Sequence, residues 1–138
     1  MAHPKRPAGD LYDWYQRGLA LLRNGDPAAA GQLLAHAHDA EPHSRSIREA
    51  LARARFDSGD FRSSARIFES LVDEDPADDY AHFGLGLALG RLGESRVAHG
   101  HLSMAVTMRP ASSDYQQALR SLRDEVRESR QDSEGESR

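Results

Sequence analysis

The fold of this chain is decided by residues 11–44, which read LYDWYQRGLALLRNGDPAAAGQLLAHAHDAEPHS. Apolar residues recur at helical spacing on both sides of Gly25. Gly25 can adopt the left-handed backbone conformation that ends a helix, Pro27 suits the first turn of the next helix, and Pro42 would stop it. The stretch therefore predicts two helices, one that ends near Gly25 and one from Pro27 to Ala40.

The same pattern returns twice, each time 34 residues further along the chain. The residues that keep this spacing are prolines, glycines at the predicted turns and small residues where paired helices would cross: Pro42, Pro76 and Pro110; Gly25, Gly59 and Gly93; Gly18, Ala52 and Gly86. So many agreements at one period indicate an internal repeat with units 11–44, 45–78 and 79–112. A single helix pair is too small to bury its apolar face, so the pairs are expected to stack on one another.

These units resemble the tetratricopeptide repeat, a 34-residue helix pair with Trp, Gly, Ala and Pro at fixed offsets. The first unit matches that signature through Trp14, Gly18, Gly25, Ala30, Ala37 and Pro42. The resemblance implies an all-α fold, a right-handed α-solenoid of three helix pairs. Two departures from the family pattern are polar residues at the tryptophan position, Arg48 in the second unit and His82 in the third.

Residues 113–128 follow the third unit and are predicted to form a single capping helix. Its apolar stripe consists of Tyr115, Leu119, Leu122 and Val126. A terminal helix with one apolar and one polar face covers the last repeat of a stack and keeps it soluble. Ser113 and Gln116 fit a capping box at its start. The repeat domain is thus expected to span residues 11–128, with residues 1–10 and 129–138 disordered.

The stretch from Phe83 to Gly93, FGLGLALGRLG, contains four glycines and raises the question of a phosphate-binding loop. Such a loop follows a β-strand, whereas the residues before Phe83 are polar and turn-forming. The repeat instead makes this stretch the first helix of the third unit, with Gly86 at a close helix crossing. Gly84 and Gly90 are unusual inside a helix. Two interpretations stay open for them: sequence drift, or space for a group bound against this helix.

The composition argues against several classes of function. A net charge of −4 and a pI near 5.9 disfavour binding to nucleic acid or to an anionic membrane. There is no cysteine, and the pairs His36/His38 and His99/His101 are predicted not to chelate a metal, because residues two apart on a helix point away from each other. No nucleophile motif surrounds a serine. We expect no cofactor, no metal and no enzymatic activity.

The ends and the amino-acid usage of the chain lead to expectations about its location and source. The two basic residues near the N-terminus precede no apolar run, so a signal peptide is not predicted, and no stretch is apolar enough for a membrane span. A cytoplasmic location is expected. Lys5 is the one lysine among 18 basic residues, which together with the many alanines is typical of a GC-rich, bacterial genome.

The family resemblance implies a function in protein binding. In tetratricopeptide proteins the first helices of successive repeats line a concave groove that binds a peptide or helix of a partner. The family pattern places in that groove Tyr12, Tyr15, Leu19 and Arg23 of the first unit, Glu49, Arg53 and Phe56 of the second, and Tyr80, Phe83, Leu87 and Arg91 of the third. Aromatic and arginine side chains are frequent hot spots of binding. Any one of the aromatic residues could instead pack on a neighbouring helix.

The resemblance also allows one specific ligand to be tested against the sequence. Family members that bind the C-terminal tail of a chaperone hold its carboxylate with lysine, asparagine and arginine at five positions. The matching residues here are Tyr15, Leu19, Ala50, Tyr80 and Gly84, none of which can play that part. The sequence therefore predicts an adaptor or scaffold that binds a more apolar segment of another protein. The alternative is a structural role in which the groove or an exposed repeat end forms a homodimer.

Overall fold

The computed structural model describes residues 8–136, which form seven α-helices and no β-strand. The helices are α1 Leu11–Arg23, α2 Pro27–Ala40, α3 Arg45–Asp57, α4 Phe61–Glu74, α5 Asp79–Arg91, α6 Ser95–Met108 and α7 Ser113–Glu136. The all-α repeat fold predicted from the sequence is confirmed. Because α1, α3, α5 and α7 begin at residues 11, 45, 79 and 113, the 34-residue period continues into α7.

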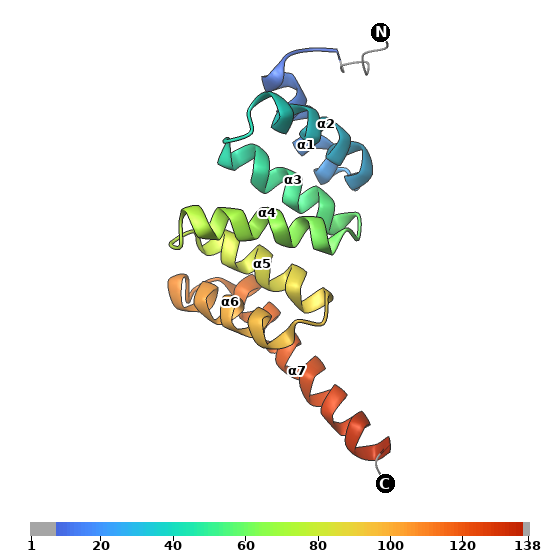
Figure 1. Cartoon of the computed structure of the whole chain (residues 1–138), viewed down its shortest axis with the longest axis vertical. Coiled ribbons are helices and arrows are strands. Elements are labelled where there is room, and N and C mark those ends of the chain that lie inside the picture. Colours follow the sequence, from blue (N-terminus) through green and yellow to red (C-terminus); the bar gives the residue numbers. More distant parts are fainter. Residues whose placement is uncertain (1–7, 137–138) are drawn as a thin grey trace.

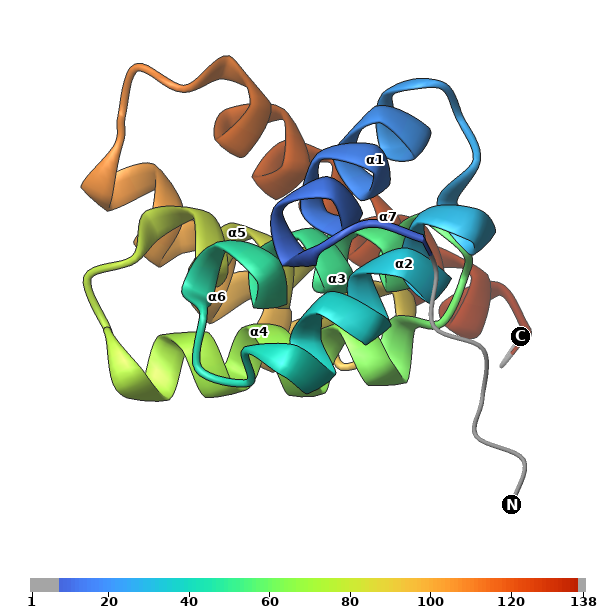
Figure 2. The ribbon, with the colours of Figure 1, turned by 90° about the horizontal axis from the view of Figure 1, so that it is seen from above.

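The helices form an elongated stack in which each helix packs on the one before it (Figure 1). In addition, α1 contacts α3, α3 contacts α5, and α5 contacts α7. When the stack is viewed along its length, α1 and α4 lie on opposite sides (Figure 2). The first helices of the pairs therefore form one layer and the second helices form the other. Within residues 8–136, no helix combines the length and the apolar composition that a bilayer crossing requires.

The turn inside each pair combines a glycine with an acidic residue, and both have a structural role. Gly25, Gly59 and Gly93 have φ angles of 80°, 85° and 83°, a left-handed conformation that favours glycine. Asp26 and Asp60 follow the first two and accept a hydrogen bond from the backbone N–H three residues on, which caps α2 and α4. Glu94 takes the same place before α6 without a side-chain capping bond. The glycine thus ends one helix, and in the first two units the aspartate starts the next.

The core lies where the two helices of each pair cross. Leu34, Phe68 and Leu102 occupy the same position in the three second helices and are almost fully buried. A Cβ atom added at Gly18 would lie 2.7 Å from Leu34 Cγ, and one at Gly86 would lie 2.7 Å from Leu102 Cγ. Carbon atoms do not approach so closely, so a larger residue would push these helices apart. This geometry confirms the predicted place of Gly86 at a close crossing.

Gly84 resolves the question left open for the glycine-rich stretch. A Cβ atom at Gly84 would lie 2.4 to 2.5 Å from three carbon atoms of the Phe68 ring, which is 2% exposed. The Phe68 ring of α4 therefore fills the space beside Gly84. At Gly90 the added atom would lie 3.6 Å from Leu122 Cδ1, an ordinary contact distance. Only the first of these two glycines is required by its neighbours.

The two polar residues at the tryptophan position are buried and hydrogen-bonded. Arg48 donates from Nη1 to Glu74 Oε2 and from Nη2 to Ser70 Oγ, both on α4. His82 Nε2 lies 2.8 Å from the Pro76 carbonyl oxygen, and His82 Nδ1 lies 3.0 Å from His101 Nδ1 on α6. Because a carbonyl oxygen only accepts, His82 donates from Nε2; with a neutral His82 ring, Nδ1 is then the acceptor and His101 Nδ1 the donor. In both units, hydrogen bonds between paired helices replace the packing of a tryptophan.

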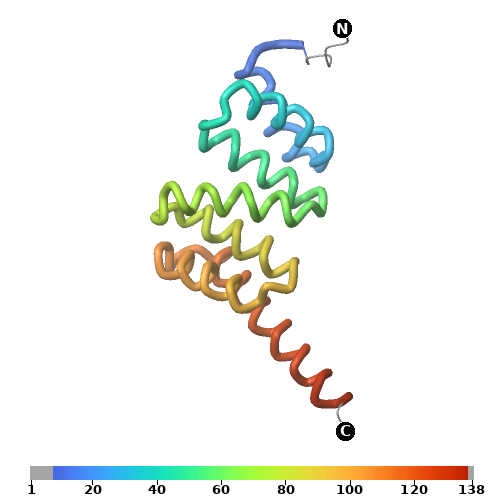
Figure 3. Tube along the Cα trace, viewed as in Figure 1, coloured from blue at the N-terminus to red at the C-terminus, as the bar shows by residue number. Residues whose placement is uncertain are grey.

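The C-terminal helix is longer than predicted. It ends at Glu136, so residues 129–136 are helical where disorder was predicted, and the helix extends beyond the stack (Figure 3). The local composition allows this, because Arg130, Gln131, Glu134 and Glu136 are good helix formers and the segment contains no proline. The predicted capping box at Ser113 is also wrong by one residue. Ser112 Oγ accepts the hydrogen bond from the Tyr115 backbone N–H at 3.2 Å.

The predicted N-terminal disorder is corrected for residues 8–10. Asp10 and Asp13 form a capping box at the start of α1, in which each side chain accepts from the other residue's backbone N–H. Arg17 Nη1 also donates to the Ala8 carbonyl oxygen at 3.0 Å. These contacts tie residues 8–10 to α1. Residues 1–7 and 137–138 lie outside the described residues, and their disorder stays a prediction.

Candidate protein-binding surface

The eleven residues predicted to line a groove all lie on α1, α3 and α5, and we call the surface they share the first-helix face. Tyr12, Arg23 and Arg91 are exposed, Tyr12 to 69%. The other eight are partly buried: Tyr15, Leu19, Glu49, Arg53, Phe56, Tyr80, Phe83 and Leu87. Partial burial means that one side of each of these side chains packs on the stack while another side stays accessible.

At two repeat positions the first-helix face is apolar in its outer units and charged in its central unit. Corresponding positions hold Tyr15, Glu49 and Phe83, and a second set holds Leu19, Arg53 and Leu87. Tyr15 packs against the core of the first pair, and Phe83 packs against Leu102 and Leu119 at the other end of the stack. The apolar ends are therefore supported by the core, and the charged pair lies between them.

The charged centre is partly removed from water. Burial, and after it the nearby Asp78 carboxylate, raise the pKa of Glu49 above its usual value, while Arg53 acts in the opposite direction. Burial also raises the pKa of Tyr80, and Arg53 again opposes the shift. Arg53 of α3 is thus a cation that acts on both Glu49 and the Tyr80 hydroxyl. In the part of the chain that the structure describes, no three histidine, aspartate or glutamate side chains converge as metal ligands.

A row of aromatic rings connects α5 to α4 and α7. The centre of the Tyr80 ring lies 6.1 Å from that of Phe68 and 6.0 Å from that of Phe83, and Phe83 lies 4.7 Å from Tyr115. The Tyr115 hydroxyl in turn donates to Asp79 Oδ2 at 2.7 Å. Burial and this hydrogen bond raise the pKa of Tyr115, which keeps the hydroxyl protonated as a donor. Phe83 is therefore a contact between helices as well as a surface residue.

Two phenylalanine rings fix Arg91 at the turn end of the first-helix face. The guanidinium carbon lies 6.0 Å from the centre of the Phe56 ring and 5.2 Å from that of Phe61. The two rings meet edge to face at 5.1 Å, and their attraction for the cation is a cation–π interaction. Phe61 begins α4, a second helix, so the family pattern for the groove did not include it.

A sequence model described as "Tetratricopeptide repeat" matches residues 21–88, from the end of α1 into α5. The helix pairs, the 34-residue register and the glycine turns all agree with this match. The chain is a tetratricopeptide repeat protein. No curated protein matches the sequence.

Several solved structures are similar to this chain in fold. The "First TPR of Spaghetti (RPAP3) bound to HSP90 peptide SRMEEVD" superposes with a TM-score of 0.76 at 16% identity, covering 84% of this chain and 92% of that one. MamA from Desulfovibrio magneticus RS-1, from residue 41 to its end, superposes with a TM-score of 0.79 at 22% identity, covering 91% of this chain and 71% of that one. The Arabidopsis OM64 TPR domain superposes with a TM-score of 0.76 at 16% identity, covering 83% of this chain and 94% of that one. At these identities the likeness concerns the fold alone.

In this tetratricopeptide repeat protein the first-helix face continues onto α7. Gln117 and Ser121 occupy the positions that Phe83 and Leu87 hold 34 residues earlier. Gln117 Nε2 donates to Ser121 Oγ at 3.4 Å, and both residues are at least partly exposed. Residues 113–128 were predicted to be a cap only, although the 34-residue register, extended by one unit, places Gln117 and Ser121 on this face. The face therefore ends on a polar helix.

Proposed function

We propose that this chain is a non-catalytic adaptor that binds a segment of another protein across the first-helix face. The observation that supports it most is the position of Tyr15, Tyr80 and Phe83, three half-buried aromatic side chains around the charged pair of Glu49 and Arg53. Rings already packed on one side offer contact area and have little freedom left to lose on binding. A domain of the same fold, that of Spaghetti, has been determined with a bound peptide.

The proposed ligand has apolar anchors at both ends of its contact region and mixed charge between them. Tyr15 and Leu19 would take one anchor, and Phe83 with Leu87 would take the other. Arg53 would donate hydrogen bonds to a carboxylate or a carbonyl oxygen of the ligand. A purely acidic segment would be repelled by Glu49, so at least one basic or neutral residue is expected at the centre of the ligand.

The acidic C-terminal tail of a chaperone suits this face less well. Two of the five family positions for its carboxylate hold Ala50 and Gly84, which are buried, and Gly84 lies against the Phe68 ring. The other three hold Tyr15, Leu19 and Tyr80, which have no positive charge. We therefore expect an internal segment of the partner rather than its C-terminus.

The test is to select peptides from a random display library on the purified chain and to measure the Kd of a selected peptide by fluorescence anisotropy. Tyr15→Ala and Arg53→Glu are each expected to raise Kd at least about 10-fold. The effect of Arg53→Glu should decrease at high salt, because screening weakens interactions between charges.

The matched control is Arg96→Glu, which reverses an exposed charge on the second helix α6. Circular dichroism verifies that each variant keeps its helix content. Affinities that stay equal in the two face variants, or that fall only in Arg96→Glu, would place the binding surface elsewhere and contradict the proposal. Failure to select any binding peptide would contradict it as well.

A further inference from the structure

The second helix of the central unit has an unusual charge pattern. Arg62, Arg66, Glu69 and Asp73 of α4 are all exposed, and their spacing of three or four residues places them on one side of the helix. We call these four residues the α4 charge stripe. From the N-terminal to the C-terminal end of α4, the stripe is first positive and then negative.

The charges of the stripe are unfavourable within α4 itself. Arg62 and Arg66 are like charges four residues apart, as are Glu69 and Asp73, and such pairs weaken a helix. The order also opposes the helix macrodipole, which favours acidic residues near the N-terminus and basic residues near the C-terminus. The ion pairs found within residues 8–136 involve none of the four. Among the interactions found within residues 8–136, the one interaction of the stripe with another helix is the electrostatic attraction between Glu69 and His101 of α6.

The repeat does not require this pattern either. The same four positions hold Ala28, Gln32, Ala35 and Asp39 in α2, and Arg96, Gly100, Ser103 and Thr107 in α6. Neither set changes from positive to negative along the helix, although both helices pack in the stack as α4 does. The pattern thus belongs to the central unit alone and calls for an explanation outside the fold.

The stripe is complementary to itself. Arg62 and Asp73 are equally far from the midpoint between Arg66 and Glu69, so a two-fold axis through that midpoint would place each arginine opposite an acidic residue of an antiparallel copy. Four ion pairs would form over the length of the stripe, about 16 Å at 1.5 Å per residue. An interface made of one surface patch meeting its own copy is the commonest arrangement in protein dimers.

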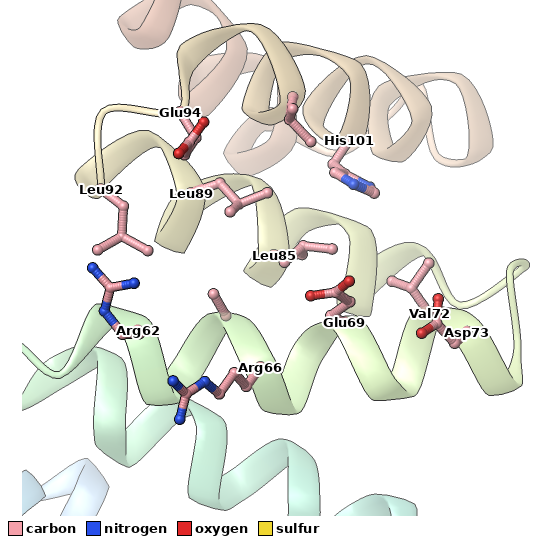
Figure 4. A pocket seen from close by; sticks show the side chains of 12 residues that line it. Arg62, Arg66, Glu69, Val72, Asp73, Leu85, Leu89, Leu92, Glu94 and His101 are labelled. Carbon is pink, nitrogen blue, oxygen red and sulfur yellow. The ribbon is translucent and has the colours of Figure 1, made fainter.

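The four stripe residues line a hollow between α4 and α6 that also has an apolar part (Figure 4). Leu85, Leu89 and Leu92 line it together with Val97 of α6. Val97 is 51% exposed, and Met104 on the same helix is 45% exposed. A second copy seated on the stripe would cover part of this apolar area, which adds a hydrophobic contribution to the charge pairing.

Two further titratable groups line the hollow. Glu94 adds a carboxylate near the start of α6, and His101 lies across the hollow from Glu69 (Figure 4). We infer that this surface, the α4 charge stripe with the hollow that it lines, binds a second copy of the same chain with the two α4 helices antiparallel. The charge stripe lies on a second helix, and the surface includes none of the eleven residues of the first-helix face, so the inference is independent of the proposed function.

The test is the oligomeric state of the full chain, measured by sedimentation velocity over micromolar to millimolar concentrations. The wild type is expected to dimerise. The double variant Arg62→Glu with Arg66→Glu, and separately Glu69→Arg with Asp73→Arg, should each weaken the dimer at least about 10-fold, because like charges then face each other. Mixing the two double variants should restore a dimer that contains one chain of each kind.

The matched control is Arg123→Glu with Arg127→Glu, which reverses two exposed arginines four residues apart on α7. It should dimerise as the wild type does. A wild type that stays monomeric at all concentrations overturns the inference. So does a dimer that survives both stripe variants, or a mixture of the two variants that fails to associate although each is folded by circular dichroism.

Discussion

Replacing Gly84 with alanine should destabilise the protein, although alanine is the better helix former. The added methyl carbon would lie 2.4 Å from Phe68 Cζ and 2.5 Å from both Cε atoms, whereas ordinary contact begins at 3.4 Å. The ring would have to move by about 1 Å, and it is buried and packed edge-on against Tyr80. Overpacking of this kind costs about 1–3 kcal/mol. Because three ring atoms lie close, we expect the upper part of that range. The higher helix propensity of alanine offsets about 1 kcal/mol, so the free energy of unfolding should fall by about 1–2 kcal/mol.

Gly90→Ala is the matched control on the same helix. Its added carbon would lie 3.6 Å from Leu122 Cδ1, so no overpacking is expected, and stability should rise by up to about 1 kcal/mol. The free energy of unfolding is measured for both variants by urea denaturation followed by circular dichroism. The reasoning is refuted if Gly84→Ala is as stable as the wild type or if both substitutions change stability in the same direction.

Three further predictions follow from α7 and from the two buried polar residues. Ending the chain after Pro110 should expose apolar surface and cause aggregation, which light scattering would detect. Ending it after residue 128 should leave the melting temperature unchanged, because residues 129–136 are exposed. If the chain that ends at Pro110 is as soluble as the full chain, α7 is not a cap. Arg48→Ala should lower the free energy of unfolding by about 2 kcal/mol, because Ser70 and Glu74 lose their partner; a urea midpoint equal to that of the wild type would contradict this. Burial, and then His82, lower the pKa of His101 from its usual 6.5, so the unfolded chain binds the proton first and stability is lost as the pH falls below that value. The decrease in the free energy of unfolding between about pH 7.5 and about pH 5.5 should be smaller in His101→Gln than in the wild type. Equal decreases would argue that the His82–His101 pair does not cause the pH dependence.

The sequence allowed most of the fold to be predicted because the repeat signals are local. Gly25, Gly59 and Gly93 mark turns whose left-handed backbone only glycine adopts easily, and they set the register of every helix pair. The end of α7 could not be predicted in the same way, since no glycine turn or proline marks it. The choice of Ser112 over Ser113 as the cap depends on one backbone hydrogen bond, which the pattern of residue types does not distinguish.

The candidate surface was predicted less completely because its details depend on contacts between helices. The family pattern assigned Phe83 and Arg91 to the first-helix face, but it did not include the Tyr115 ring beside Phe83 or the Phe61 ring beneath Arg91. Both partners lie outside the first helices of the three units. The partners of Arg48 and His82 were not predicted either, because a family signature gives no information about the contacts of residues that depart from it.

The claim that the first-helix face binds a protein segment is tested most directly by mapping the contact on the chain itself. Two-dimensional amide NMR of the isotope-labelled protein would be recorded while a peptide selected from the display library is added. The account predicts the largest shift changes along α1, α3 and α5, around Tyr15, Arg53 and Tyr80. Changes confined to α4 and α6, or spread evenly over the chain, would contradict it.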